Sequence, residues 1–372
     1  MKWCKKCVYP EVAVDFTFNE EGICSGCLAK SETKKINWDL EFKNFKEILY
    51  KYKSKNNYDC IIPVSGGKDS YFQTYIVKKK LGLNPLLVTY NGHNYLDIGL
   101  KNLKNMREAF GCDHYFFTPS LNAIKELNIL GFKLTGDPNW HAHAGISTLP
   151  FIISVKFKIP LIIWGEHASD LNGKNFLSEK IEWTKRERDE KDLRGFDIND
   201  FLKKSKKIKK TDLLSFYYPT DEEINSVGTR GIFLGNYVKW DGNYNYQIAK
   251  KFGFKVPKKK FQRTYRIFSN LDDRYENGLH DYMKFVKYGY GRTTDHASRD
   301  IRLGKINRKT AIKLVKKYDS VIPDDLYYWL KYVGMSEKEF WRIANSYRDK
   351  RVWRFKSGVW TKDNIWDQKK SL

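Results

Sequence analysis

Short apolar runs alternate with amphipathic stretches over the first half of the chain. Four runs are too short for helices and read as buried strands, at residues 60–64, 85–90, 115–118 and 161–164. The stretches that follow them repeat apolar residues at helical spacing. Mostly apolar strands that alternate with helices predict an α/β fold with a parallel sheet covered on both faces.

The six residues between the first strand and the next helix carry the most specific local pattern, Ser65-Gly66-Gly67-Lys68-Asp69-Ser70. Two glycines let backbone N–H groups approach an oxyanion closely, and the helix N-terminus adds partial positive charge. The spacing of G-x-x-x-x-G-K-[ST] is missing, so transfer of a γ-phosphoryl group is not indicated. We therefore predict an anion-binding loop, the alternative being an ordinary Gly-Gly turn before a helix.

Polar residues follow two other predicted strands, beyond whose carboxyl ends an open parallel sheet binds its ligands. Residues 91–94 follow the second strand, and Gly165, Glu166 and His167 follow the fourth. We expect both segments to lie beside the loop. Glu166 and Asp170 are candidates for a metal contact or for orienting an acceptor, and their alternative is that of carboxylates in solvent.

Two histidines, His141 and His143, form an H-x-H pair that is a possible metal-binding element. No third ligand is close in the sequence, so a loop or substrate-contact role is favoured.

Four cysteines near the N-terminus follow the pattern C-x2-C-x16-C-x2-C: Cys4, Cys7, Cys24 and Cys27. Each pair brings two thiolates to one turn, and two turns complete a closed tetrahedral S4 site. We predict a structural Zn²⁺ ribbon, with a rubredoxin-like iron site as the main alternative. Six cysteines in 372 residues do not make a disulfide scaffold.

From about residue 172 to residue 260 the pattern is less regular, with a charged insert at 179–210 followed by the stretch 231–241. We interpret this region as a lid or substrate-facing extension. The C-terminal third is predicted to be helical, with Asn307 and Ser336 as helix caps. Before the first of these caps, residues 287–302 combine two glycines with several arginines, aspartates and a histidine. An arginine fork suits carboxylate or phosphate recognition, and the alternative is an Asp-Arg ion-pair network at a helix start.

A net charge of +24 invites a nucleic-acid interpretation, but the basic residues are dispersed along the chain. The densest cluster, residues 203–210, is equally well explained as a solvated face. Aromatic content of 16% excludes a disordered chain. No apolar run is long enough to span a bilayer, so we expect a cytoplasmic protein.

The S-G-G-x-D-S signature resembles the PP-loop of ATP pyrophosphatases. Together with the four cysteines, Gly165-Glu166, Tyr237-x-x-Trp240 and the stretch from Lys287 to His296, it resembles the N-acetyl sugar amidotransferases of the WbpG/PseA type. This resemblance implies three regions: a zinc ribbon (1–35), a PP-loop ATP pyrophosphatase core (36–175) and an insert or lid with a helical substrate region (176–372).

The resemblance also implies site residues and cofactors. Asp69 would bind Mg²⁺, and a structural Zn²⁺ would occupy the ribbon. The residues implied to bind ATP or pyrophosphate are Ser65, Gly66, Gly67, Lys68, Asp69, Ser70, Thr89, Tyr90 and Gly165. Those implied to be catalytic are Lys68, Asp69, Glu166, Asp170, Arg292 and Asp295.

The implied reaction converts a sugar acetamido group to an acetamidino group through an adenylated imidate, releasing AMP and pyrophosphate, in lipopolysaccharide or flagellin-glycan synthesis. No cysteine sits in a nucleophile elbow, so we expect a separate glutaminase partner to supply ammonia. The alternatives are a PP-loop tRNA-modifying enzyme, of thiolase or lysidine-synthetase type, and a nucleotide-sensing ribbon protein.

Overall fold

The computed structural model describes residues 1–93, 95–165, 180, 182–269 and 276–368. The side chains of Glu32, Lys34 and Glu187 are not described. Among the described residues, no helix combines the length and apolar character needed to cross a bilayer.

The centre of the molecule is a five-stranded parallel sheet with the strand order β3-β2-β1-β4-β5. The strands are β1 (Cys60–Pro63), β2 (Pro85–Tyr90), β3 (His114–Phe117), β4 (Leu161–Trp164) and β5 (Arg230–Phe233). Central strand β1 pairs with both neighbours, Ile61 lying opposite Leu86 on β2 and Ile162 on β4. The predicted α/β class and all four predicted strands are confirmed.

Strand β5 corrects the interpretation of residues 172–260 as a lid. Arg230–Phe233 pairs with the whole of β4, from Leu161 opposite Arg230 to Trp164 opposite Phe233. The apolar part of this strand is short and lies in a charged neighbourhood, so its pattern did not stand out. The region beyond residue 175 therefore supplies part of the sheet, although the domain boundary itself stays a prediction.

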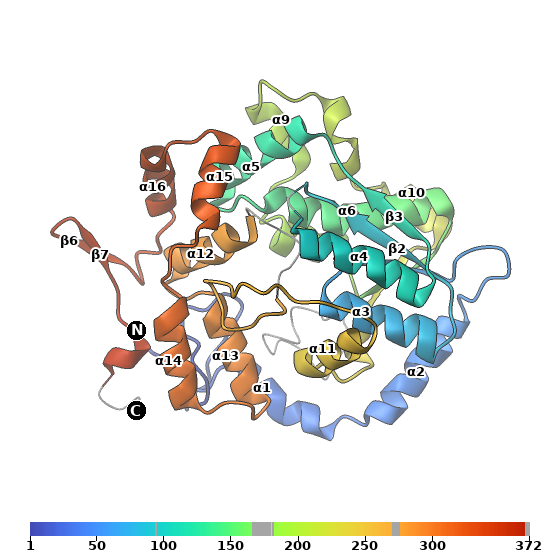
Figure 1. Cartoon of the computed structure of the whole chain (residues 1–372), viewed down its shortest axis with the longest axis horizontal. Coiled ribbons are helices and arrows are strands. Elements are labelled where there is room, and N and C mark those ends of the chain that lie inside the picture. The colour runs from blue at the N-terminus through green and yellow to red at the C-terminus, as the bar shows by residue number, and fades with distance from the viewer. Residues whose placement is uncertain (94, 166–179, 181, 270–275, 369–372) are drawn as a thin grey trace.

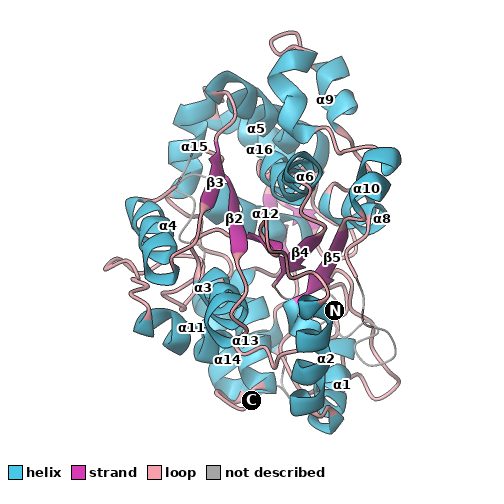
Figure 2. Ribbon diagram, turned by 90° about the vertical axis from the view of Figure 1, so that its right-hand side faces the viewer, coloured by secondary structure: helices cyan, strands magenta, loops and turns pink. Residues whose placement is uncertain are grey.

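Helices cover both faces of the sheet (Figure 2). One face carries α2 (Trp38–Tyr50), α3 (Lys68–Thr74), α4 (Asp97–Phe110) and α11 (Gly242–Lys251). The other carries α5 (Leu121–Thr135), α6 (Trp140–Phe157), α8 (Lys185–Glu187), α9 (Ile198–Lys204) and α10 (Asp221–Val227). Alternate strand residues divide between the two cores, Ile62 facing the first and Ile61 the second.

The C-terminal region packs five helices beside the sheet domain: α12 (Glu276–Tyr288), α13 (Arg292–Arg302), α14 (Arg308–Tyr318), α15 (Asp325–Val333) and α16 (Glu337–Ser346). A two-stranded hairpin, β6 (Arg354–Lys356) and β7 (Val359–Thr361), follows them. Phe132 of α5 stacks on Phe340 with ring centroids 4.9 Å apart, which ties these helices to the sheet domain. Asn307 and Ser336 cap α14 and α16 as predicted.

The four-cysteine segment and its helix α1 (Ser25–Glu32) pack against α13 and α14 (Figure 1). Tyr9 donates a hydrogen bond of 2.9 Å to Asp295, and Arg308 donates one of 3.1 Å to the carbonyl of Cys7. Asp363, from the C-terminal segment, lies nearby, 2.7 Å from the Met1 amino group. Segments from opposite ends of the sequence therefore build one contact surface.

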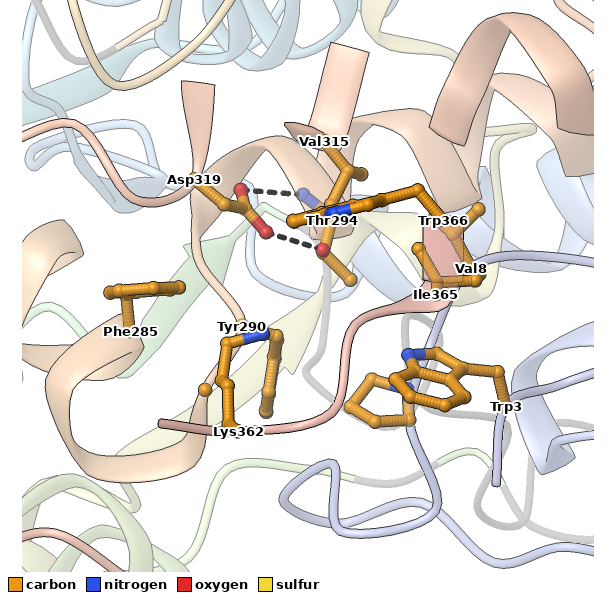
Figure 3. Close-up of a pocket in the computed structure, with 12 residues that line it drawn as sticks. Trp3, Val8, Phe285, Tyr290, Thr294, Val315, Asp319, Lys362, Ile365 and Trp366 are labelled. Carbon is orange, nitrogen blue, oxygen red and sulfur yellow. Dashed lines mark hydrogen bonds between the residues drawn. The ribbon is translucent and has the colours of Figure 1, made fainter. Parts of the chain in front are cut away.

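A small cavity lies at this junction, lined by Trp3 and by residues of α12, α13 and the C-terminal segment (Figure 3). At its edge, the carboxylate of Asp319 accepts hydrogen bonds from the backbone N–H groups of Gly291 and Thr294, at 2.9 and 3.2 Å. It also accepts one from the Thr294 hydroxyl at 2.6 Å. Asp319 thus caps the N-terminus of α13 from outside that helix.

Candidate functional site

The predicted loop lies at the point where the strand order reverses, between β1 and β4. Gly66 has a φ of +76°, and a Cβ atom there would lie 2.7 Å from the Cγ of Leu103, so only glycine fits. The Ser65 N–H donates to the Ser70 hydroxyl at 3.0 Å, which closes the loop on the first turn of α3. The strand, tight loop and helix that the sequence predicts are therefore present.

Asp69 meets a partner from a distant helix. The Asn245 side-chain amide, on α11, donates a hydrogen bond of 2.8 Å to Asp69 Oδ1, and Lys68 forms an ion pair with Asp69 Oδ2. Asn245 is fully buried, and its Oδ1 has no hydrogen-bond partner among the described residues. No sequence pattern marks Asn245, because an asparagine in a run of Asn and Tyr residues forms no motif.

Cationic side chains from the C-terminal region gather near the loop. Burial holds the pKa of His296 well below its usual value, and the charges of Arg266, Arg292, Arg299 and Lys68 lower it further. Lys68 Nζ lies 5.6 Å from the centre of the Phe268 ring, and Arg266 lies 5.9 Å from the same ring. Arg266 also donates a hydrogen bond of 2.6 Å to Asp300 of α13, so the loop lies close to that helix. Arg292 and Arg299 are seven residues apart and share one helix face with His296. Such a set of positive charges suits a polyphosphate.

Asp295, predicted to be catalytic, lies in a buried ion-pair network. Lys284 approaches its two carboxylate oxygens at 2.9 and 2.8 Å, and Tyr9 donates to the first. Burial alone would raise the pKa of Asp295, but Lys284 and Arg292 outweigh it and hold the pKa below its usual value. This geometry is that of the ion-pair alternative, and a catalytic role for Asp295 stays a prediction.

Arg292 has an acidic neighbour as well, since its Nε lies 3.3 Å from Asp281 of α12. About a quarter of the Arg292 side chain is exposed, 27%, whereas Asp281 is buried. The Arg292 side chain thus contacts α12 while part of it is accessible to solvent. Its role toward substrate stays a prediction.

The other predicted site residues lie along the carboxyl edge of the sheet. Thr89 donates to the carbonyl of Val64 at 2.6 Å, and Tyr90 bonds His141 at 3.0 Å, so both side chains are occupied. Gly165 follows β4, and a Cβ atom there would lie 3.4 Å from Trp240. The predicted residues Glu166, His167 and Asp170 lie outside the described residues.

Tyr90 belongs to a buried chain of hydrogen bonds that the sequence did not reveal. His141 bridges Tyr90 to Glu276 of α12, at 3.0 and 2.7 Å. Glu276 accepts from Asn128, whose own Oδ1 accepts from Trp329. This chain connects the carboxyl end of β2 to the C-terminal helices.

The four cysteine sulfurs converge in the N-terminal segment, and all four residues are buried. Two sulfur pairs lie 4.0 Å (Cys4 and Cys27) and 3.5 Å (Cys7 and Cys24) apart. Four thiolates at about 2.3 Å from one Zn²⁺ would lie about 3.8 Å from each other. Backbone N–H groups of Cys7 and Cys24 donate to Cys4 Sγ, at 3.4 and 3.3 Å. The cluster therefore fits a tetrahedral metal ion, and its distances do not separate zinc from iron.

Two solved structures resemble this chain weakly. An NH3-dependent NAD synthetase from Campylobacter jejuni, in complex with nitrate, is 14% identical, with a TM-score of 0.29 over 60% of this chain and all of the synthetase. An NMN synthetase from Francisella tularensis is 12% identical, with a TM-score of 0.29 over 61% of this chain and all of its own. Overlaps this low assign no reaction to the chain.

One curated relative, an uncharacterised protein of Methanocaldococcus jannaschii, is 32% identical over 111 residues. The match covers 24% of this chain and 40% of the relative. It therefore reaches less than half of either protein.

The C-terminal half has a clearer relationship. Residues 236–366 match the family model of the LPS biosynthesis protein WbpG-like, C-terminal domain. This range includes Asn245, Arg292, Arg299 and the ion-pair network of Asp295. Over residues 236–366, about a third of its length, the chain is therefore similar to the WbpG-like C-terminal domain.

Proposed function

We propose that this protein is an ATP-dependent amidotransferase that converts an acetamido group of a sugar to an acetamidino group during surface-glycan synthesis. The observation that carries the proposal is the contact between Asp69 of the glycine loop and Asn245, which lies within the WbpG-like range. One site is thus built from a nucleotide-type loop and from a domain named for lipopolysaccharide biosynthesis.

The reaction needs activation because an amide is a poor electrophile. Attack of the amide oxygen on the α-phosphate of ATP would form an adenylated imidate and release pyrophosphate. Ammonia would then add to the imidate carbon, and AMP would leave. The loop N–H groups and the cations Lys68, Arg292 and Arg299 would stabilise the negative charge that develops on the phosphates.

The residues around Asp69 fit a magnesium ion. A carboxylate is a hard oxygen ligand, and the buried Oδ1 of Asn245 offers a second oxygen that lacks a partner among the described residues. Mg²⁺ bound there would neutralise phosphate charge. Asn245 itself holds the Asp69 carboxylate in one orientation.

The direct test is incubation of the purified protein with ATP, ammonium and a panel of acetamido sugars, free and nucleotide-linked. We expect AMP, pyrophosphate and a sugar whose mass has changed by replacement of O with NH, as measured by mass spectrometry. Release of AMP without a change in any sugar, or a modified base in added tRNA, would contradict the proposal.

The RNA alternative lacks support in the placement of the basic cluster. Residues 203–210 begin in the last turn of α9, which lies away from α3 in both views (Figures 1 and 2). Lys207 lies 3.6 Å from Glu126, and most of its side chain is exposed, 74%. We therefore expect RNA binding, if measured, to be weak and to fall steeply with salt.

We also propose that a separate glutaminase supplies the ammonia. The two cysteines outside the metal cluster are Cys60 in β1 and Cys112 before β3, and both are buried. Burial raises the pKa of Cys112 to about 11 and that of Cys60 well above its usual value. Neither thiol suits nucleophilic attack on glutamine.

The isolated protein should use a high ammonium concentration but not glutamine, and addition of the partner glutaminase should restore glutamine use. Efficient glutamine-dependent turnover by this chain alone would show the partner proposal to be wrong. It would leave the sugar amidination intact.

A further inference from the structure

A second cluster of metal-type ligands lies where α6 meets α12. Asp137 lies in the short connection between α5 and α6, His143 comes from the first turn of α6, and His280 comes from α12. One carboxylate oxygen and one ring nitrogen from each histidine lie within 4.8 Å of one another. The two histidines of the H-x-H pair therefore have different surroundings. His141 bonds Tyr90 and Glu276, whereas His143 lies beside Asp137 and His280, one of which is distant in the sequence.

The spacing approaches that of a coordinated ion. His280 Nδ1 lies 2.9 Å from each carboxylate oxygen of Asp137, and the rings of His143 and His280 are 5.6 Å apart. Ligand atoms bound at about 2.1 Å to one metal ion lie about 3.0–3.4 Å apart. The ring nitrogens of His143 form no hydrogen bond with another described residue. A bound ion would give this imidazole the partner it lacks there.

We propose that Asp137, His143 and His280 bind a divalent transition-metal ion, separate from the four-cysteine site and from Asp69. Two imidazoles and one carboxylate suit zinc, iron or cobalt, whereas magnesium and calcium prefer all-oxygen sites. Three protein ligands leave room for an exchangeable one. The side chain of His280 is 25% exposed, which gives that position access to solvent.

The surroundings hold the carboxylate in place. The Asn139 N–H donates to Asp137 Oδ1 at 3.0 Å, and Arg194 pairs with Oδ2. The charges of Arg194 and Lys287 also act on Asp137. These cations oppose a bare positive ion, so binding rests on coordination by the imidazoles rather than on net charge. Arg194 therefore competes with a metal ion for the Asp137 carboxylate.

The site is joined to the carboxyl edge of the sheet through the same two helices. His141 and Glu276, from α6 and α12, connect to Tyr90 at the end of β2. The metal would fasten α12 to α6 on the side of the sheet where ligands bind.

Cobalt binding to the full chain, first loaded with one equivalent of zinc, which the four thiolates bind in preference, tests the proposal. Equilibrium dialysis should find one Co²⁺ per chain, and X-ray absorption should show nitrogen and oxygen ligands without sulfur. His280→Asn and His143→Asn should each weaken Co²⁺ binding at least about 100-fold. His93→Asn is the matched control: it removes a histidine with a φ of 68°, which asparagine tolerates, and should change nothing.

Arg194→Gln gives a result that loss of folding cannot imitate. Removing its charge should tighten Co²⁺ binding several-fold, because less repulsion opposes the ion. No cobalt beyond the cysteine site in the wild type, sulfur ligands only, or unchanged binding in both histidine variants would overturn the proposal. In those cases Asp137 and His280 are a hydrogen-bonded pair without a metal.

Discussion

Asp69 is the residue on which the proposed chemistry depends most directly. We expect Asp69→Asn to lower the rate of pyrophosphate release roughly 100- to 1,000-fold, because a neutral amide cannot replace the anionic ligand. The fold should survive, since the partners Lys68 and Asn245 are polar and adapt to an amide. A coupled pyrophosphate assay measures the rate, and circular dichroism checks folding.

Asp113→Asn is the matched control for this substitution. Asp113 precedes β3 at the opposite edge of the sheet and accepts a hydrogen bond of 2.7 Å from Tyr58. Its variant should keep normal turnover. Near-normal turnover in Asp69→Asn would remove the assignment of the loop.

Asn245 offers a test of positioning rather than of charge. We expect Asn245→Leu to change the free energy of unfolding by less than about 1 kcal/mol, because the substitution also removes the buried, unpartnered Oδ1. Turnover should fall at least about tenfold, because the Asp69 carboxylate loses its orienting donor. Parallel losses of stability and turnover would instead indicate a purely structural asparagine.

At the residue scale, the sequence predicted the members of the loop but not their partners. Gly66 and Asp69 stand in a recognisable order within six residues. Asn245 reaches Asp69 across 176 positions, and nothing in its own neighbourhood marks it. Such partners are set by how helices pack, which a local pattern does not encode.

At the scale of elements, the tight loop before α3 leaves no room for a side chain at position 66. Gly82→Ala should cost about 1–2 kcal/mol of unfolding free energy, because its φ is +66° but no atom lies within 4 Å of the new Cβ. Gly66→Ala should cost about 1–3 kcal/mol more, because its Cβ also meets Leu103. Chemical denaturation compares the two variants, and equal costs would contradict the close approach at Gly66.

The cap of α13 predicts a dependence of stability on pH. Burial raises the pKa of Asp319 to about 6, above its ordinary value of 3.8. A carboxyl with a raised pKa stabilises the folded state fully below about pH 4 and loses that contribution as the pH rises through 6. The contribution is on the order of 3 kcal/mol.

Asp319→Asn should remove this pH dependence. The unfolding free energy of the wild type relative to the variant should fall between pH 4 and pH 7, as measured by denaturant titration at each pH. The amide keeps an oxygen acceptor for the bond from Thr294 that Figure 3 shows. Parallel stability curves for the two proteins would mean that Asp319 titrates normally.

Elements were predicted correctly where their own residues form a clear pattern. They were missed where pairing with a neighbouring strand determines the structure. The strand at residues 85–90 is predicted to the residue, because five apolar, aromatic or β-branched positions follow Pro85. Strand β5 forms by pairing with β4. Its first two residues are Arg230 and Gly231, so its sequence lacks the apolar run typical of a buried strand. The ion pairs of Asp295 likewise depend on α12 lying beside α13.

At the scale of the molecule, the four-cysteine segment should act as a structural anchor. Cys4→Ser should lose the metal ion and lower the unfolding temperature together, because the segment carries contacts from Tyr9 and Cys7 to α13 and α14. Cys112→Ser, a change at a buried cysteine outside the cluster, should keep the metal. Metal analysis and thermal unfolding measure both effects, and a Cys4→Ser protein with full metal content would remove the site.

The contact between the four-cysteine segment and α13 has a consequence for synthesis on the ribosome. Tyr9 and Asp295 are 286 residues apart, and Cys7 and Arg308 are 301 apart. The four-cysteine segment therefore leaves the ribosome early, and it lacks its contacts with α13 and α14 until those helices have been translated. We expect ribosome-bound chains arrested before residue 291 to expose this segment to protease, and chains arrested well past residue 320 to protect it. Equal protection at both lengths would mean that the segment is stable by itself.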